Sequence, residues 1–186
     1  MKLHFIDQTF SFELLRGRVM DSTVVQKSAK CSRQRSRYVK AFLRASNYYR
    51  MAVFFLAPDD SRRMYTFEKS RIAFWQFLEL FGLCVEGVCI PYEGTMLPGY
   101  FYRVDASNEV RPTLVALGGF DSTGEELYFF PAAAALQRGY NVLTFEGPGQ
   151  GEPLRVEYLP ARHDYEFPVG AAVDYLLSIK KLKLLP

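Results

Sequence analysis

The chain has 186 residues, of which 49% are hydrophobic and 16% aromatic, and its 23 basic and 20 acidic side chains leave a formal net charge of +3. This composition supplies a core and excludes an intrinsically disordered chain. The length suits one ordinary domain, or a small domain with part of another. The longest apolar run near the N-terminus, 51–57, is far shorter than the roughly 20 residues that span a bilayer. Residues 1–8 include Asp7 and Gln8 and form no secretory apolar region, so we expect no membrane association.

The three cysteines, Cys31, Cys84 and Cys89, are odd in number and lack the spacing of metal ligands. Disulfides persist mainly in oxidising compartments. The pattern therefore predicts a reduced, cytoplasmic protein without a metal site.

The N-terminal part has helical periodicity. Over 24–56, one helix or two, apolar side chains recur at three- and four-residue steps and predict a buried stripe of Phe42, Ala45, Tyr49, Ala52 and Leu56. A turn-forming segment, 58–61, ends this pattern. A second helix is predicted over 66–81, with an apolar face of Phe67, Phe74, Leu78 and Phe81 and with Gly82 as its left-handed cap. We therefore expect a helical N-terminal region over 1–83.

A basic segment lies within this region. No acidic residue occurs between Asp21 and Asp59, whereas eight lysines and arginines do, interleaved with aromatic residues. Such a segment can bind a nucleic-acid backbone. It can also be a helix with a solvated basic side and a buried aromatic side. The helical spacing of the aromatic residues favours the second interpretation, and we predict no nucleic-acid partner.

The pattern changes to strands at Cys84. Residues 85–90 alternate like a strand, 100–104 match them, and 92–95 supply the turn of a hairpin. A polar loop, 106–109, precedes a buried strand over 113–117. A helix over 132–137 should end near Gly139, with a kink or late start caused by Pro131. A second buried strand follows over 141–146.

This order predicts an α/β fold in which strands 113–117 and 141–146 are parallel and joined by a helical crossover. The helical region comes first, and 84–186 form the sheet-containing domain.

Each of the two strands runs into glycines. Gly119 and Gly124 have the spacing of a phosphate-binding loop, but Glu125 and Glu126 occupy the positions of its Lys and Ser/Thr and would repel a phosphate. In 147–151 the third glycine comes one residue too early for the dinucleotide fingerprint, and no periodic helix follows. We therefore expect no nucleotide cofactor.

An oxyanion loop is another interpretation of Gly118-Gly119-Phe120. Backbone N–H groups of such a loop must reach a carbonyl oxygen that becomes negative, and glycines permit that approach. Ser122 and Glu125 match a capping box that would fix the following helix. Alternatively, Gly118 and Gly119 only allow a tight turn, and the residues alone leave both interpretations open.

Longer stretches resemble a known family. The run 118–126, GGFDSTGEE, and the run 138–151, RGYNVLTFEGPGQG, resemble α/β-hydrolases of the subgroup that includes pseudooxynicotine-cleaving hydrolases and fungal hydrolases that shorten polyketides. Residues 44–50 are similar to a recurring helix of that subgroup. Residues 164–166 and 173–177 resemble its approach to the nucleophile strand. The resemblance covers about 40–178 and suggests the N-terminal half of such a fold, with an incomplete sheet.

The resemblance implies a serine hydrolase that cleaves esters or ketone-adjacent C–C bonds of small acyl or polyketide substrates, without a cofactor. Of the functional residues of that family, only those of the oxyanion loop have a counterpart in this sequence. The resemblance assigns the oxyanion-binding amides to Gly119 or Phe120 and suggests that Asp121 helps to shape the loop. The family's nucleophile lies in a G-x-S-x-G elbow, which these 186 residues do not contain. Neither His4 nor His163 can replace the catalytic histidine by position, and His163 is expected at the surface.

We therefore expect this chain to be inactive alone, as a truncated or misjoined product; the Lys- and Leu-rich residues 178–186 favour a change of frame. The alternative is a non-catalytic binding module that pairs, as homo- or hetero-oligomer, with a full-length relative through the helical region. The resemblance also places the hydrophobic strand 113–117 at a bare sheet edge, which favours aggregation.

Overall fold

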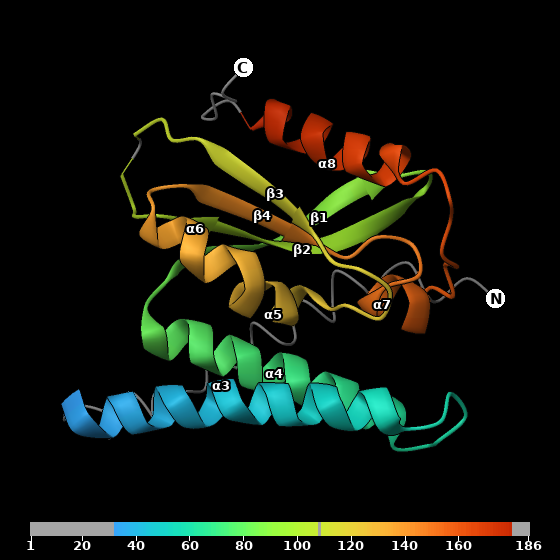
Figure 1. Cartoon of the computed structure of the whole chain (residues 1–186), viewed down its shortest axis with the longest axis horizontal. Coiled ribbons are helices and arrows are strands. Elements are labelled where there is room, and N and C mark those ends of the chain that lie inside the picture. The colour runs from blue at the N-terminus through green and yellow to red at the C-terminus, as the bar shows by residue number, and fades with distance from the viewer. Residues whose placement is uncertain (1–31, 108, 180–186) are drawn as a thin grey trace. The chain divides into compact units, whose positions relative to one another are not determined.

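The computed structural model describes residues 32–107 and 109–179, and they form two compact units that divide between Gly82 and Leu83. The first unit contains two long helices, and the second contains a four-stranded sheet with helices on both faces (Figure 1). This order confirms the α/β class and the helical region that precedes the sheet.

The first unit is a pair of helices, α3 (Ser32–Phe55) and α4 (Arg63–Phe81), which lie side by side. Gly82 ends α4 with a φ of 79°, and its N–H donates to the Leu78 carbonyl at 3.0 Å. The predicted left-handed cap is confirmed. Helix α4 begins three residues before the predicted start, after a turn in which the N–H of Arg63 donates to the Asp60 carbonyl.

The stripe predicted for the first helix is wrong in its register. Within 35–55 of α3 the buried positions are Ser46 and Val53, whereas Tyr49 is 39% exposed. Ser70 of α4 donates its hydroxyl to the Ser46 carbonyl at 2.8 Å, so small side chains of the two helices meet at this point. On α4, Phe81 was expected on the buried face but is exposed. Residues 24–31 of the predicted helix lie outside the described part of the chain.

The second unit begins with the predicted hairpin, β1 (Cys84–Tyr92) and β2 (Thr95–Arg103), which pair antiparallel along their whole length. Its turn consists of Glu93 and Gly94, with φ values of 41° and 82°. Two positive φ values in a two-residue loop match the twist of the flanking strands, which explains why the strands extend up to the turn.

Two parallel strands complete the sheet: β3 (Thr113–Leu117) and β4 (Asn141–Phe145). The strand order is β1-β2-β4-β3, with β4 antiparallel to β2. All five residues of β4 are buried. Strand β3 pairs only with β4 among the described residues, so it forms the edge of this sheet.

The crossover from β3 to β4 is helical but not uniform. It runs from α5 (Gly124–Leu127) through a π-helical turn, η2 (Tyr128–Ala132), into α6 (Ala133–Gln137). Pro131, which lacks an N–H, lies inside the π-helical turn, where it produces the irregularity expected at this position.

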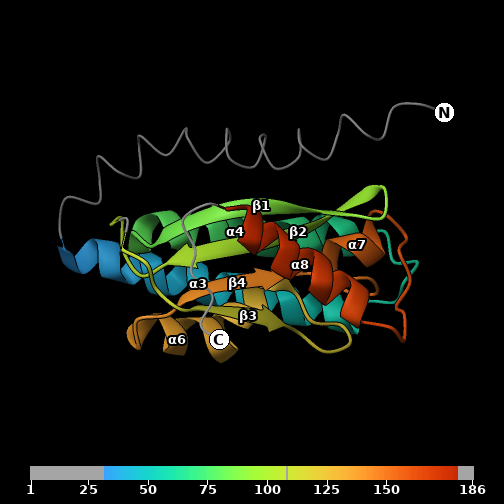
Figure 2. The ribbon, with the colours of Figure 1, turned by 90° about the horizontal axis from the view of Figure 1, so that it is seen from above.

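The opposite face of the sheet is covered by α8 (Glu166–Ser178), seen above the strands in Figure 1 and crossing them in Figure 2. Its Ala172 and Leu176 pack on Ile90 and Phe145 of the sheet, and all four are fully buried. A short helix of five residues, α7 (Gly151–Arg155), begins at the end of the second glycine cluster, where the sequence predicted no periodic helix. No helix in 32–107 or 109–179 has the length and apolarity that crossing a membrane requires.

Candidate functional site

The candidate site lies where β3 and β4 end. Because the two strands are parallel and adjacent, the segments after them leave the same edge of the sheet. We call 118–123 the first glycine loop and 146–150 the second glycine loop. The first leads into α5 and the second into α7 (Figure 1).

Gln150 ties the two loops together. Its Nε2 donates to the carbonyl of Gly118 at 2.5 Å and to the carbonyl of Gly119 at 2.9 Å. Its Oε1 accepts a hydrogen bond from the N–H of Gly147 at 2.9 Å. The Gln150 residue is only 4% exposed, and its bond with Gly147 is buried.

Glu146, the first residue after β4, is a second buried link. Its Oε1 accepts from the N–H of Gly124 at 2.8 Å, and its Oε2 accepts from the N–H of Glu152 at 2.7 Å. Both donors belong to the first turn of a helix, α5 or α7, where N–H groups have no partner within the helix. One carboxylate therefore caps two helices.

This cap replaces the predicted capping box. The residue before α5 is Thr123, whose side chain makes no capping hydrogen bond. The hydroxyl of Ser122 instead donates to Oε2 of Glu126 at 3.1 Å. Glu125 is turned into the protein, where its Oε1 accepts from the hydroxyl of Tyr100 at 2.6 Å. The capping-box prediction was wrong because Glu146, distant in sequence, supplies the acceptor.

The two residues singled out from the sequence lie on the exposed side of the first glycine loop. Gly119 is exposed, with no atom within 4 Å of the place where a Cβ would be, and Phe120 is 81% exposed. Within the described part of the chain, neither backbone N–H donates to a protein acceptor. Two free donors on one loop can bind an oxygen that carries negative charge.

Gly118 and Asp121 shape this loop in different ways. A Cβ on Gly118 would lie 2.1 Å from the Ser122 hydroxyl oxygen, so only glycine fits there. Asp121 has a φ of 62°, a left-handed conformation that a short polar residue tolerates. The N–H of Ser122 donates to the Gly119 carbonyl at 3.2 Å and closes the turn.

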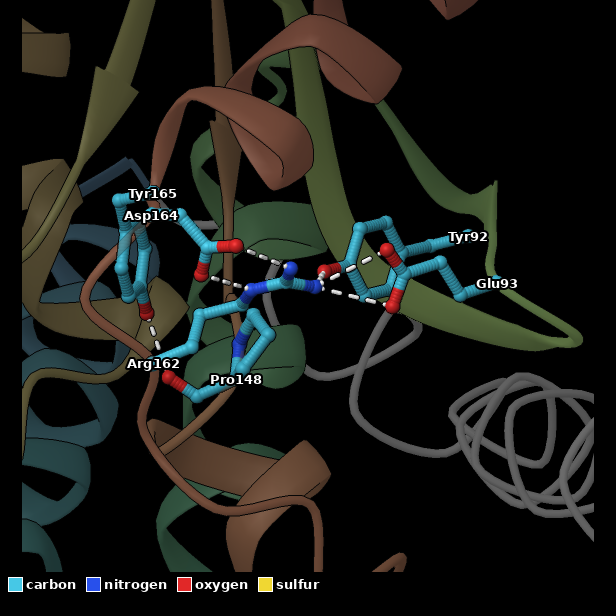
Figure 3. A network of polar contacts seen from close by, with 6 residues as sticks. All are labelled: Tyr92, Glu93, Pro148, Arg162, Asp164 and Tyr165. Atoms are coloured by element: carbon cyan, nitrogen blue, oxygen red, sulfur yellow. Dashed lines mark hydrogen bonds and ion pairs between the residues drawn. The ribbon is translucent and has the colours of Figure 1, made fainter.

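The second glycine loop is held from its other side by the segment before α8 (Figure 3). Tyr165 donates its hydroxyl to the Pro148 carbonyl at 2.5 Å. Arg162 pairs with Asp164 through two bonds of 2.6 and 2.7 Å and with Glu93 at 2.9 Å, and it also contacts the Tyr92 hydroxyl.

The Arg162 guanidinium lowers the pKa of Asp164 from 3.8 to about 2. His163, between these two residues, is exposed, as expected. Among the described residues there is no group of three or more His, Cys, Asp or Glu that could hold a metal ion.

Comparisons with known proteins show the family of this chain. No protein-family model matches the chain. A hydrolase of Aspergillus aculeatus, acrC, is 47% identical over 154 residues, which are 74% of this chain and 36% of that protein. The α/β-hydrolase psoB of Aspergillus fumigatus is 39% identical over 164 residues, 83% of this chain and 37% of that protein. The chain belongs to the α/β-hydrolase superfamily.

Other relatives of this α/β-hydrolase include the 20-hydroxy-prefusarin hydrolase FUS2 of Gibberella moniliformis, 42% identical over 142 residues, 73% of this chain and 34% of that protein. The chain spans about a third of the length of these curated relatives. Among solved structures, 2,6-dihydroxy-pseudo-oxynicotine hydrolase covers 92% of this chain with a TM-score of 0.70 at 23% identity, the chain covering 45% of it. The structure AbyA5 covers 77% of this chain with a TM-score of 0.55 at 20% identity, the chain covering 42% of it. These two likenesses concern the fold.

Reasoning from the sequence located the first glycine loop of this α/β-hydrolase but missed Glu146 and Gln150, which organise it. A signal for them was present. Glu146 ends the strand predicted to lie parallel to 113–117 and Gln150 follows it, and the carboxyl ends of adjacent parallel strands meet at one edge. Polar residues at and after the end of the second strand could therefore have been assigned to the first loop.

Proposed function

We propose that this chain supplies the oxyanion-binding part of a serine-type α/β-hydrolase that cleaves esters, or C–C bonds next to a ketone, in small acyl or polyketide substrates. The observation that carries the proposal is the pair of backbone N–H groups of the exposed residues Gly119 and Phe120, which have no acceptor among the described residues. The names of the relatives support a hydrolase of fungal secondary metabolism.

In the proposed reaction, a serine attacks the substrate carbonyl carbon, and the carbonyl oxygen takes up negative charge. Donors already aimed at that oxygen stabilise the transition state without reorganisation. The N–H groups of Gly119 and Phe120 are assigned this role. The serine, its histidine and the acid are assigned to residues outside this sequence, since the 186 residues contain no G-x-S-x-G elbow. Alone, these residues are expected to show no triad-dependent turnover.

A chimaera tests the proposal. The segment of the Aspergillus aculeatus hydrolase that matches this chain at 47% identity is replaced by the corresponding residues of this chain. The chimaera is expected to hydrolyse aryl esters and to react with a serine-directed fluorophosphonate, whereas the 186-residue chain does neither. A chimaera that is folded but inactive, beside an active parent hydrolase, would refute the proposal.

A binding module is the second candidate, and an exposed apolar stripe on α3 favours it. Tyr48, Met51 and Phe55 lie three and four residues apart and are all exposed, Phe55 by 76%. We propose that the helical region, 1–83, is a domain distinct from 84–186 and pairs through this stripe with a full-length relative. Co-purification with the Aspergillus aculeatus hydrolase, lost in Phe55→Glu, would support pairing. A monomeric chain that captures no relative would exclude it.

The odd number of cysteines supports a proposed cytoplasmic location. Cys84 and Cys89 both lie partly buried on β1. Disulfides persist mainly in oxidising compartments. Fractionation of the native host with an antibody to the chain would test the location.

A further inference from the structure

The amide group of Gln150 has a defined orientation. Its three partners are two carbonyl oxygens, of Gly118 and Gly119, and one N–H, of Gly147. Rotating the amide by 180° would place its oxygen against two carbonyl oxygens and its NH2 against an N–H. The network therefore requires Nε2 to face the first glycine loop.

That orientation determines where two peptide groups of the first glycine loop point. In a trans peptide the C=O and the following N–H point to opposite sides, and the described chain contains no cis peptide. Because the Gly118 carbonyl faces Gln150, the N–H of Gly119 points away from it. Because the Gly119 carbonyl also faces Gln150, the N–H of Phe120 points away as well. The same NH2 group thus sets both N–H groups to one side.

We infer that Gln150 is the positioning residue of the oxyanion site: its NH2 group holds the two carbonyls so that the N–H groups of Gly119 and Phe120 both point away from Gln150, toward the side where the substrate oxygen binds. This inference rests on the proposed function. Gln150 does not touch the substrate, since it is buried and lies on the carbonyl side of both peptides. Its effect on the reaction passes through the direction of the two N–H groups.

A merely structural role for Gln150 would affect stability alone, and two variants distinguish these roles. Gln150→Glu keeps the oxygen that accepts from Gly147 but places a second oxygen against the carbonyls of Gly118 and Gly119. Gln150→Met keeps the length of the side chain and removes all three bonds. Val88→Ala, a cavity variant on the β1 side of the core, is the stability control.

The first measurement uses the chimaera described above. Loss of one oxyanion donor costs about 100- to 1000-fold in kcat, so both Gln150 variants are expected to lower kcat at least about 100-fold. KM should change little, because the ground-state carbonyl binds these donors weakly. Val88→Ala should lower the melting temperature by as much as the Gln150 variants do, but it should retain the kcat of the wild-type chimaera. Unchanged kcat, or a loss that merely follows the melting temperature, would overturn the inference.

The second measurement uses the 186-residue chain and needs no turnover. In ¹H–¹⁵N spectra, titration with acetate is expected to shift the amide signals of Gly119 and Phe120 in the wild type. The shifts should vanish in Gln150→Glu. An equal response in both proteins, or none in the wild type, contradicts the positioning role. An inactive wild-type chimaera whose Gln150-dependent acetate response persists would instead refute only the proposed hydrolysis.

Discussion

Glu146 holds Gly124 by a hydrogen bond of 2.8 Å between a side-chain oxygen and a backbone N–H 22 positions away in the chain. The other oxygen of the same carboxylate caps α7 through Glu152. A Cβ on Gly151 would lie 2.1 Å from that oxygen, so glycine at this position leaves room for the carboxylate. The crossover after β3 and the helix after β4 thus begin at one buried charged group.

Replacing Glu146 by glutamine should destabilise the second unit. The NH2 group of the new side chain must face one of the two N–H donors, of Gly124 or Glu152, and leaves it buried without an acceptor. Losing one buried bond to a charged group costs about 2 kcal/mol in the free energy of unfolding. Urea unfolding followed by circular dichroism would measure this loss of stability. Glu126→Gln, which leaves the cap by Glu146 intact, is the control. Equal urea midpoints for Glu146→Gln and Glu126→Gln would contradict the capping of both helices by Glu146.

Alanine substitutions should distinguish the two glycines of the first loop. Gly118→Ala places a Cβ 2.1 Å from the Ser122 hydroxyl oxygen and should cost about 1 to 3 kcal/mol through overpacking. Gly119→Ala meets no atom within 4 Å and should change stability by less than about 1 kcal/mol. In the chimaera, Gly119→Ala should nevertheless lower kcat, because the methyl group would occupy space beside the substrate oxygen. Gly119→Ala with full activity would count against an oxyanion role for this loop.

The Arg162 network predicts a loss of stability in acid. Its guanidinium lowers the pKa of Asp164 from 3.8 to about 2, so the folded chain binds a proton there less readily than the unfolded chain does. The stabilising contribution is therefore present above the unfolded pKa of 3.8 and is lost as pH falls through about 2. Thermal melts from neutral pH down to this range should show a shallower acid decline for Asp164→Asn. Parallel declines in both proteins would show that the pair does not affect folding.

The buried Tyr102 should make the folded chain less stable at alkaline pH, whereas the Arg162–Asp164 pair acts in acid. Burial raises the pKa of Tyr102 well above 10.0, and Glu125 and Tyr128 raise it further. The folded state keeps its proton above pH 10.0 while the unfolded state loses it, so this contribution to stability is lost as pH rises. Tyr102→Phe should remove that part of the alkaline decline and leave stability near neutral pH almost unchanged. Alkaline unfolding of the wild type and of Tyr102→Phe at the same midpoint pH would contradict this role of Tyr102.

Local patterns in the sequence predicted the hairpin, the two buried strands and the cap at Gly82, because residues near one another in sequence determine each of these. Two of the wrong predictions involved partners distant in sequence. The register of α3 depends on the Ser46–Ser70 contact, and the start of α5 depends on Glu146. A helical-spacing argument cannot detect such contacts, since they arise from packing between elements.

The site was predictable to the same extent. The preceding strand and the two glycines, Gly118 and Gly119, predicted that Gly119 and Phe120 lie on a tight loop. The resemblance to the family suggested that their N–H groups bind the oxyanion. Neither indicated which way the peptide groups face. That direction is determined by Gln150, which reaches the loop from 31 and 32 positions further along the chain.

The exposed edge of β3 predicts how the 186-residue chain behaves when it is made alone. Among the described residues, β3 pairs on one side only, and Leu114 on this strand is 37% exposed. An unpaired hydrophobic edge offers N–H and C=O groups to a second chain, whereas a charged side chain on the edge discourages such pairing. We expect concentration-dependent association in size-exclusion chromatography with light scattering. Leu114→Lys should reduce this association, while Leu177→Lys, an equally polar change on the exposed side of α8, should not. A monomeric wild type with one sharp melt would mean that β3 is protected within this chain.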